Sequence, residues 1–165
     1  MAAYTTIDNP ELYFQTKIYS GDGNDDRNIV FDVTDTSLQP NMLWSARRDS
    51  ADNLSKYDSV RGDGKELRTA ETGAQYDRSD NIQALNSNGF QVGTDGQVNA
   101  SGGTYVSWAW KESATAGFDI LTFTGNASGN QTVSHNLSAV PKWWNIKRLD
   151  QASNWCTYHV GLGGA

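Results

Sequence analysis

Apolar and polar residues alternate in short stretches along the chain, and Gly, Asn or Asp bounds most of these stretches. A period of two places successive side chains on opposite faces, as in a strand with one buried face. The pattern predicts nine short strands, over residues 12–19, 28–33, 42–47, 56–60, 90–92, 104–111, 118–124, 142–148 and 154–160. Many short strands separated by turn residues are typical of an all-β fold, and we expect them to form an antiparallel β-sandwich.

Residues 105–110 show the alternation most clearly. One face of this predicted strand carries Val106, Trp108 and Trp110, and the other carries Tyr105, Ser107 and Ala109. We expect the tryptophan face in the core, because burying large apolar side chains stabilises a fold most. The candidate core anchors are therefore Trp44, Trp108, Trp110 and Ile146.

Turn and helix signals are few. Asp95-Gly96 is typical of a tight turn and predicts a hairpin that joins residues 90–92 to residues 97–98. Only residues 50–56 and 73–85 are compatible with a helical turn or two.

The chain contains an internal repeat. Residues 40–62 align with residues 141–163 without a gap, at a constant offset of 101. The aligned pairs include Arg47 with Arg148, Asp49 with Asp150, Tyr57 with Tyr158, and Gly62 with Gly163. We predict one domain over residues 1–165, with a first repeat at about 12–62, a block without a second copy at about 63–117, and a partial second repeat at about 118–165.

Half a repeat cannot bury its own apolar face. The second copy must pack against the first or against a neighbouring chain. We therefore expect the isolated chain to self-associate or to need a partner.

The net charge of the chain limits the classes of partner that it can bind. The chain has 19 acidic and 13 basic side chains, a net charge of −6 and a pI near 4.7, so we expect no nucleic-acid binding. No apolar run approaches the length of a membrane span, so no membrane insertion is expected. The first ten residues lack a basic or apolar run, so no signal peptide is expected either.

Metal ligands of the soft kind are scarce. One Cys and two His exclude an internal disulfide and a cysteine zinc site, and we expect no cofactor. Asp22, Asn24 and Asp26 alternate as at the start of a calcium loop. An EF-hand also needs Gly at its sixth position and Glu at its twelfth, where the chain has Arg27 and Val33. A solvated turn is favoured there, and a Ca²⁺ site of another type stays an alternative.

Aromatic residues near the C-terminus are candidate contacts with a ligand or partner. Trp143 and Trp144 are adjacent, so they point to opposite faces of a strand. Exposed indole rings stack on sugars and anchor protein interfaces. We expect one of the pair to be exposed; the alternative is that both are buried. Trp155 and Tyr158, on the next predicted strand, complete this set.

Catalytic signals are weak. No nucleophile elbow, phosphate loop, zinc helix or dinucleotide fingerprint is present, and we expect no enzyme. Cleavage of glycans by a carboxylate pair stays an alternative, because such a pair is defined in space. The Glu residues available for it are Glu11, Glu66, Glu71 and Glu112, none at the centre of a predicted strand.

Several motifs resemble a domain that recurs in virion proteins of marine tailed bacteriophages, often tail-fibre proteins. The resemblance covers residues 13–162 and lies in Gln39-Pro40, Trp44, residues 57–62, Gly89-Phe90, Val92-Gly93, Val98-Asn99, Ser101-Gly102, Tyr105-Val106, Trp108, Trp110-Lys111, His135, Pro141, Lys147, Trp155 and Tyr158-His159. It implies a lectin-like sandwich of the jelly-roll or concanavalin type. Trp143-Trp144-Asn145 departs from the family pattern, in which an aliphatic strand stands there.

The resemblance implies a structural protein displayed on a phage particle. We expect a tail-fibre or receptor-binding module that contacts host surface glycans and other virion proteins, with a homo-oligomer, a trimer favoured. A capsid or tail decoration protein is the alternative, and a glycan depolymerase is a weaker one.

Overall fold

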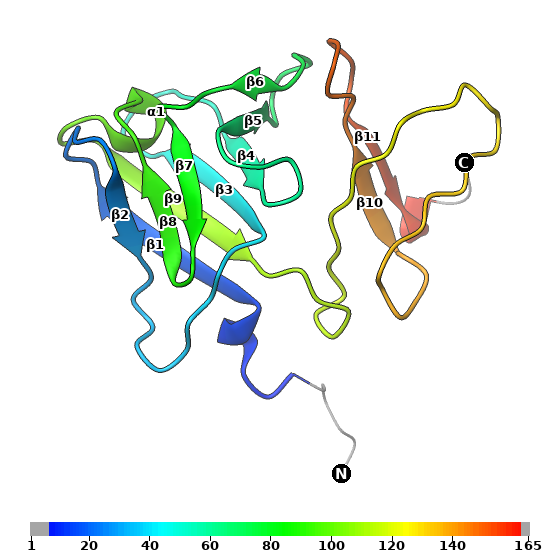
Figure 1. The fold of residues 1–165 in the computed structure, drawn as a ribbon, viewed down its shortest axis with the longest axis horizontal. Helices are drawn as coiled ribbons and strands as arrows, with labels where there is room; N and C mark the ends of the chain where they lie inside the picture. The colour runs from blue at the N-terminus through cyan, green and yellow to red at the C-terminus, as the bar shows by residue number, and fades with distance from the viewer. Residues whose placement is uncertain (1–6, 163–165) are drawn as a thin grey trace.

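The computed structural model describes residues 7–162, and this part of the chain is mostly β-structure with antiparallel pairing (Figure 1). One short helix, α1, covers Gly96–Asn99, and single 3₁₀ turns cover Pro10–Leu12 and Val160–Leu162. The strands are β1 (Phe14–Ser20), β2 (Arg27–Val30), β3 (Met42–Arg47), β4 (Ser55–Asp58), β5 (Lys65–Arg68), β6 (Tyr76–Asp77), β7 (Ile82–Asn86), β8 (Gly89–Val92), β9 (Thr104–Trp110), β10 (Trp143–Ile146) and β11 (Cys156–His159). The expectation of an all-β antiparallel fold is confirmed.

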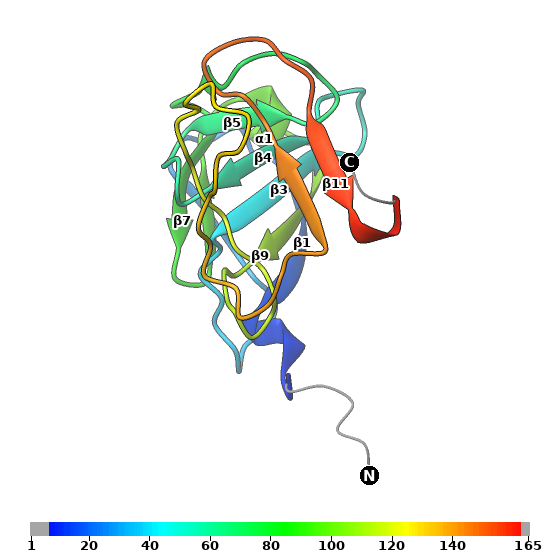
Figure 2. The ribbon, with the colours of Figure 1, turned by 90° about the vertical axis from the view of Figure 1, so that its right-hand side faces the viewer.

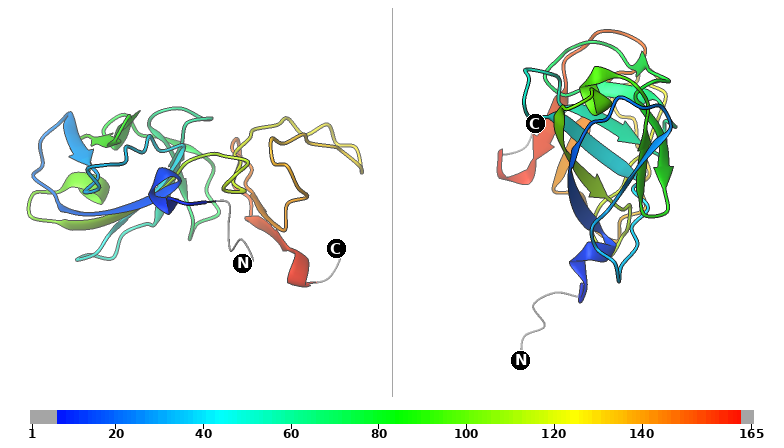
Figure 3. Two further views of the ribbon diagram at one scale, coloured as in Figure 1. Left: turned by 90° about the horizontal axis from the view of Figure 1, so that it is seen from below. Right: turned by 90° about the vertical axis from the view of Figure 1, so that its left-hand side faces the viewer.

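The strands form three sheets. Six strands pair in the order β1-β9-β3-β4-β5-β6, three pair in the order β2-β8-β7, and β10 pairs with β11 alone. The three-stranded sheet lies across one face of the six-stranded sheet (Figures 1 and 3). The core side chains come from both of these sheets and their connections: Tyr19, Ile29, Phe31, Leu38, Leu43, Tyr57, Ile82, Phe90, Val92, Val98, Tyr105 and Ala109.

Strand β9 turns its smaller face inward. Tyr105, Ser107 and Ala109 are buried, whereas Val106, Trp108 and Trp110 are only partly buried on the opposite face. Rings from neighbouring strands fill the core over Ser107 and Ala109; Tyr19, for example, stacks on Tyr105 with ring centroids 5.1 Å apart. Small side chains at these positions make room for those rings.

The expected core anchors are therefore wrong. Trp44 contacts Trp110 edge-on at 5.2 Å on the outer face of the six-stranded sheet, where Trp108 also lies. Ile146 is 40% exposed. Alternation identifies which residues share a face, but the volume available beneath each face decides which one is buried.

The expected hairpin at Asp95-Gly96 is also wrong. Asp95 is instead the N-cap of α1, because its side chain accepts a hydrogen bond from the Gln97 backbone N–H at 2.7 Å. Strand β8 pairs with β7, and its first residue is Gly89, with φ +138°. A Cβ at that position would lie 2.0 Å from the Ile29 carbonyl oxygen, so the close approach of β2 requires glycine.

Two further segments differ from expectation. Residues 118–124 form no strand and share only an isolated bridge between Ser113 and Phe118. Residues 50–56 and 73–85 contain no helix; the latter carry β6 and most of β7.

The two aligned segments form hairpins of identical register. In β3–β4, Met42 pairs with Asp58 and Ser45 with Ser55. At the same offset of 101, Trp143 pairs with His159 and Ile146 with Cys156 in β10–β11. The ion pair between Arg47 Nε and Asp49 Oδ1, at 2.8 Å, has its counterpart between Arg148 and Asp150 at 2.7 Å. Gly163, the last aligned residue, lies outside the described residues.

The surroundings of the two hairpins differ. Strand β3 pairs with β9 along its other edge, whereas within residues 7–162 no strand pairs with the corresponding edge of β10. No helix in this part of the chain is long and apolar enough to cross a membrane.

The aligned tyrosines provide a matched test of this difference. Tyr57 is buried and donates a hydrogen bond to Asn81 Oδ1 at 2.7 Å. Tyr57→Phe leaves that oxygen without its partner and should lower the free energy of unfolding by about 1–3 kcal/mol. Tyr158→Phe, at the aligned position, should change it by less than about 0.5 kcal/mol. Urea denaturation measures the free energy of unfolding of both variants. Equal losses would contradict the conclusion that Tyr57, but not Tyr158, belongs to the core.

Candidate functional site

The chain after β9 forms an arm beside the end of the body that carries β4, β5 and β6 (Figures 1 and 2). We call residues 7–112 the body and residues 113–162 the arm. Backbone hydrogen bonds join them, from Gln75 N–H to the Leu149 carbonyl at 2.9 Å and from Ser153 N–H to the Thr72 carbonyl at 2.8 Å. The arm is therefore held at the β4–β6 edge of the large sheet.

A lysine between two indole rings reinforces this junction. The Lys56 ammonium lies 4.5 Å from the ring centroid of Trp44 in the body and 4.7 Å from that of Trp155 in the arm. The Trp155 indole N–H also donates to the Arg68 carbonyl at 3.3 Å. Cation–π attraction ties the arm to the outer face of the sheet. Burial, with a smaller contribution from the positive charge of Arg61, lowers the pKa of Lys56 to about 8.

A hollow of about 610 Å³ opens between the body and the arm. The side chains that line it are Arg61 and Gln75 from the body and Thr122, Phe123, Thr124 and Leu149 from the arm. Phe123 is 45% exposed, and the hydroxyl and amide groups beside it are hydrogen-bond donors and acceptors. A flat ring beside such groups suits a polyhydroxylated ligand such as a sugar.

Arg61 is fixed before any ligand arrives. Its Nε donates to Asp58 Oδ2 at 2.6 Å, Nη2 to the Lys56 carbonyl at 3.3 Å, and Nη1 to Gln75 Oε1 at 3.3 Å. Only 5% of the Arg61 side chain is exposed. Because Asp58 neutralises the guanidinium, the hollow suits a neutral ligand better than an anion.

The aromatic residues predicted from the sequence lie outside this hollow. Trp143 is 50% exposed and Trp144 is 41% exposed, so neither is buried. Trp144 stacks on Tyr158 with centroids 5.3 Å apart and an interplanar angle of 16°. Trp155 instead faces the body. The structure thus brings Trp144 and Tyr158 together and separates them from Trp155.

The predicted calcium residues lie in the turn between β1 and β2. Asp22 accepts a hydrogen bond from the Asn24 backbone N–H at 2.9 Å and pairs with Arg27 Nε at 3.3 Å. The hydrogen bond from Asn24 lowers the pKa of Asp22. Asp26 has a φ of +55°. Within residues 7–162 no three His, Cys, Asp or Glu side chains gather as they would around a metal ion.

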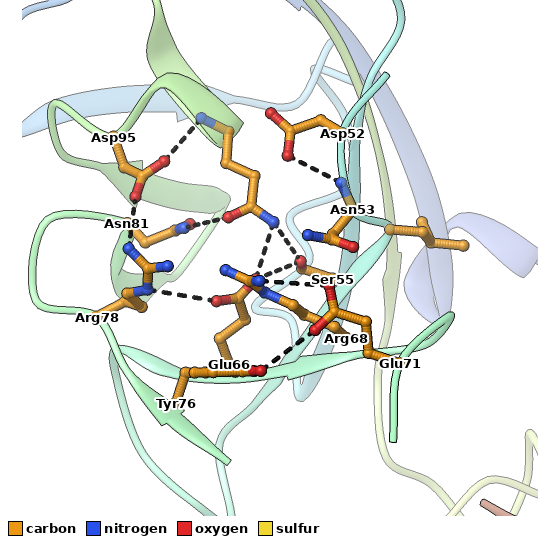
Figure 4. Close-up of polar contacts among 12 residues, drawn as sticks. Asp52, Asn53, Ser55, Glu66, Arg68, Glu71, Tyr76, Arg78, Asn81 and Asp95 are labelled. Atoms are coloured by element: carbon orange, nitrogen blue, oxygen red, sulfur yellow. Dashed lines mark hydrogen bonds and ion pairs between the residues drawn. The ribbon is translucent and has the colours of Figure 1, made fainter. Parts of the chain in front are cut away.

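A buried polar network lies under the β4–β5 end of the body, and Figure 4 shows its members. Glu66, at the centre of β5, is 0% exposed. Its Oε1 accepts from Ser55 Oγ at 2.6 Å, from Gln97 Nε2 at 2.9 Å and from Arg68 Nε at 3.1 Å. Glu66 Oε2 lies 3.7 Å from Arg78 Nε and has no hydrogen bond.

Ion pairs extend this network in both directions. Arg68 Nη1 reaches Glu71 at 3.4 Å, and Arg78 Nη1 reaches Asp95, the N-cap of α1, at 3.5 Å. The network is therefore a chain of alternating acidic and basic side chains, which runs from Glu71 near the arm to Asp95 at the start of α1. The sequence offers Glu66 only as one of four Glu residues available for a carboxylate pair, and its place in this network was missed because β5 is too short and polar to show a strand pattern. The lone signal was a Glu between Lys65 and Leu67, two residues before Arg68.

Two carboxyl groups meet where the arm leaves the body. The hydrogen bond between Glu112 and Asp119 raises the pKa of Glu112 and lowers that of Asp119. Asp119 also accepts from the Asn136 backbone N–H at 2.6 Å. Asp119 Oδ1 is buried and has no hydrogen-bond partner among the described residues. The sequence offers Glu112 as one of four Glu residues available for a carboxylate pair, but it does not indicate Asp119 as the partner.

A family model for a domain of unknown function, DUF7483, matches residues 9–165, nearly the entire chain. The chain belongs to the DUF7483 family. No curated protein and no solved structure matches the chain. The DUF7483 match covers the body and the arm together, so the junction and the hollow both lie within the family domain.

The buried carboxylate of the DUF7483 chain should be essential for stability. Glu66→Gln removes the charge that Arg68 and Arg78 face, and we expect a loss of about 3 kcal/mol in the free energy of unfolding. Glu71→Gln removes an exposed partner of the same Arg68 and should cost less than about 1 kcal/mol. Chemical denaturation compares the two; similar losses would contradict a special role for Glu66.

Lys56 should make stability increase with pH above neutrality. Folded Lys56 loses its proton near pH 8, whereas the unfolded side chain keeps it to about pH 10.5. The unfolded state therefore binds more protons between these values, and unfolding becomes less favourable as pH rises. The thermal midpoint should rise between pH 8 and pH 9.5.

Lys56→Met keeps the apolar stem and removes the titrating group. The rise in thermal midpoint between pH 8 and pH 9.5 should be smaller in this variant than in the wild type. Lys65→Met, at a partly exposed lysine of β5 that pairs with Asp77, is the control and should retain the wild-type slope. Parallel pH profiles for wild type and Lys56→Met would refute the assignment.

Proposed function

We propose that this DUF7483 chain is a non-enzymatic structural module of a tailed-phage virion, of the tail-fibre or receptor-binding type, that contacts host surface glycans. The resemblance of several motifs to phage virion domains supports the virion setting, and the hollow beside Phe123 supports the glycan contact. We further propose that the two facing sheets of the body form a lectin-like sandwich of the jelly-roll or concanavalin type.

The lining of the hollow supports a neutral sugar as the ligand. Thr122 and Thr124 offer hydroxyl groups on either side of Phe123. Gln75 adds an amide whose Oε1 accepts from Arg61 and whose side chain also hydrogen-bonds Asp77. The hollow is open to solvent rather than enclosed, so it suits a ligand that binds at the surface.

A decoration protein of the capsid or tail is the second candidate. The exposed apolar surface of the arm favours this candidate. Most of the exposed large apolar side chains among the described residues lie in the arm: Leu121, Phe123, Val140, Trp143, Trp144, Ile146, Val160 and Leu162. Such a surface also suits contact with a neighbouring shell protein. Glycan cleavage is a weaker third candidate, because the hydrogen-bonded Glu112 and Asp119 lie closer together than the roughly 5 Å or more that separates the carboxyl groups of glycosidases.

Localisation on intact particles separates these candidates. Cryo-electron microscopy of virions, with an antibody against the chain, should place it at the distal end of a tail appendage. Density spread over the capsid lattice would replace the fibre proposal with the decoration protein. Release of reducing sugar ends from host polysaccharide by the purified chain would favour the depolymerase.

Phe123 should be the main contact for a bound glycan. The purified chain should bind members of an array of bacterial surface oligosaccharides, and Phe123→Ala should weaken binding to the positive members about tenfold or more. Leu121→Ala, an exposed apolar residue of the same segment outside the hollow, is the matched control. Equal binding by wild type and Phe123→Ala would exclude the hollow as the site.

A further inference from the structure

The repeat assigns a core face to the C-terminal hairpin. In β3–β4 the side chains that face the core are Leu43, Ser45, Ser55 and Tyr57, all exposed by 2% or less. The offset of 101 gives the corresponding positions of β10–β11: Trp144, Ile146, Cys156 and Tyr158. We call these four residues the uncovered face.

The uncovered face is largely open to solvent within the described chain, although Tyr158 is partly buried. Trp144 and Ile146 are 41% and 40% exposed, and Cys156 is exposed as well. Side chains alternate along β11, so Trp155 lies on the opposite side of the hairpin from Cys156 and Tyr158. Trp155 contacts Lys56 and Arg68 of the body. The uncovered face is therefore the side turned away from the body.

The first hairpin shows what such a face requires. A second sheet covers β3 and β4 there, with Ile82, Phe90 and Val92 from β7 and β8 among the core side chains. Within residues 7–162 this second sheet occurs once and is already packed against the body. The cover for the uncovered face must come from outside these residues.

Charge identifies a second copy of the chain as a suitable cover. The body carries 17 acidic and 10 basic side chains, whereas the arm carries 2 acidic and 3 basic ones. Two bodies repel each other, but two arms approach with little net charge. The uncovered face itself has no charged residue. It is thus the surface through which two copies meet without burying an unpaired charge.

We propose that two copies of the chain pack the uncovered faces of their β10–β11 hairpins against each other around a two-fold axis. Trp144 and Tyr158 of one copy then cover the same residues of the other, as sheet covers sheet in the body. A two-fold contact is self-complementary, so one patch suffices for both partners. A single flat face matches a dimer rather than the trimer expected from the resemblance.

Analytical ultracentrifugation of the purified full-length chain tests this pairing. At 50 µM the wild type should sediment with twice the chain mass of 18.1 kDa. Trp144→Asp should sediment with the monomer mass, because a charge enters the interface. Trp143→Asp changes the adjacent residue on the opposite side of the strand, so it should leave the dimer intact.

A second measurement needs no variant that could misfold. Cys156 lies on the uncovered face, so its reaction with a thiol reagent should slow at least several-fold when the wild type is concentrated from 1 to 100 µM. The proposal is overturned by a monomer at 50 µM, by a mass of three chains, by dissociation of Trp143→Asp but not of Trp144→Asp, or by a thiol rate independent of concentration. A monomer would assign the cover to a different protein.

Discussion

The body depends on one strand, β9, which is paired along both edges and buries its inward face. It pairs with β1 on one side and β3 on the other, so it joins the first strand of the body to the hairpin at the centre of the sheet. Its inward side chains complete the core beneath the second sheet. Among residues 7–162, the arm has no strand in the position that β9 occupies in the body. No strand therefore joins segment 118–124 to β10.

The same difference between body and arm explains how the polar and apolar parts of the molecule are divided. In the body, the sheets bury most apolar side chains, and charged ones line the outside or join the network around Glu66. In the arm, one face of the β10–β11 hairpin is uncovered, so aromatic rings such as that of Trp144 are exposed to solvent. The acidic body and the nearly neutral arm therefore differ in the contacts they can make, and the hollow lies at the boundary between them.

The sequence predicts the strands with clear alternation and the repeat. Residues 42–47 form β3 as expected, and both copies of the hairpin share one register. Alternation could not tell which face of β9 is buried, because that depends on the rings of Tyr19 and Phe90 in other strands. Asp-Gly fits both a tight turn and a helix N-cap, and only the neighbouring strands decide between them. The hollow combines residues from distant segments that no local pattern links.

The junction between arm and body has a mechanical consequence. The arm is attached by backbone hydrogen bonds to the segment between β5 and β6, where only two residue pairs connect β4 to β5 and two connect β5 to β6. The long pairings of β9 with β1 and β3 lie at the opposite side of the sheet. A force pulling on the C-terminal end of the arm would therefore load the thin edge first, and the covalent connection after Trp110 would pass the load to β9 only once those contacts had opened.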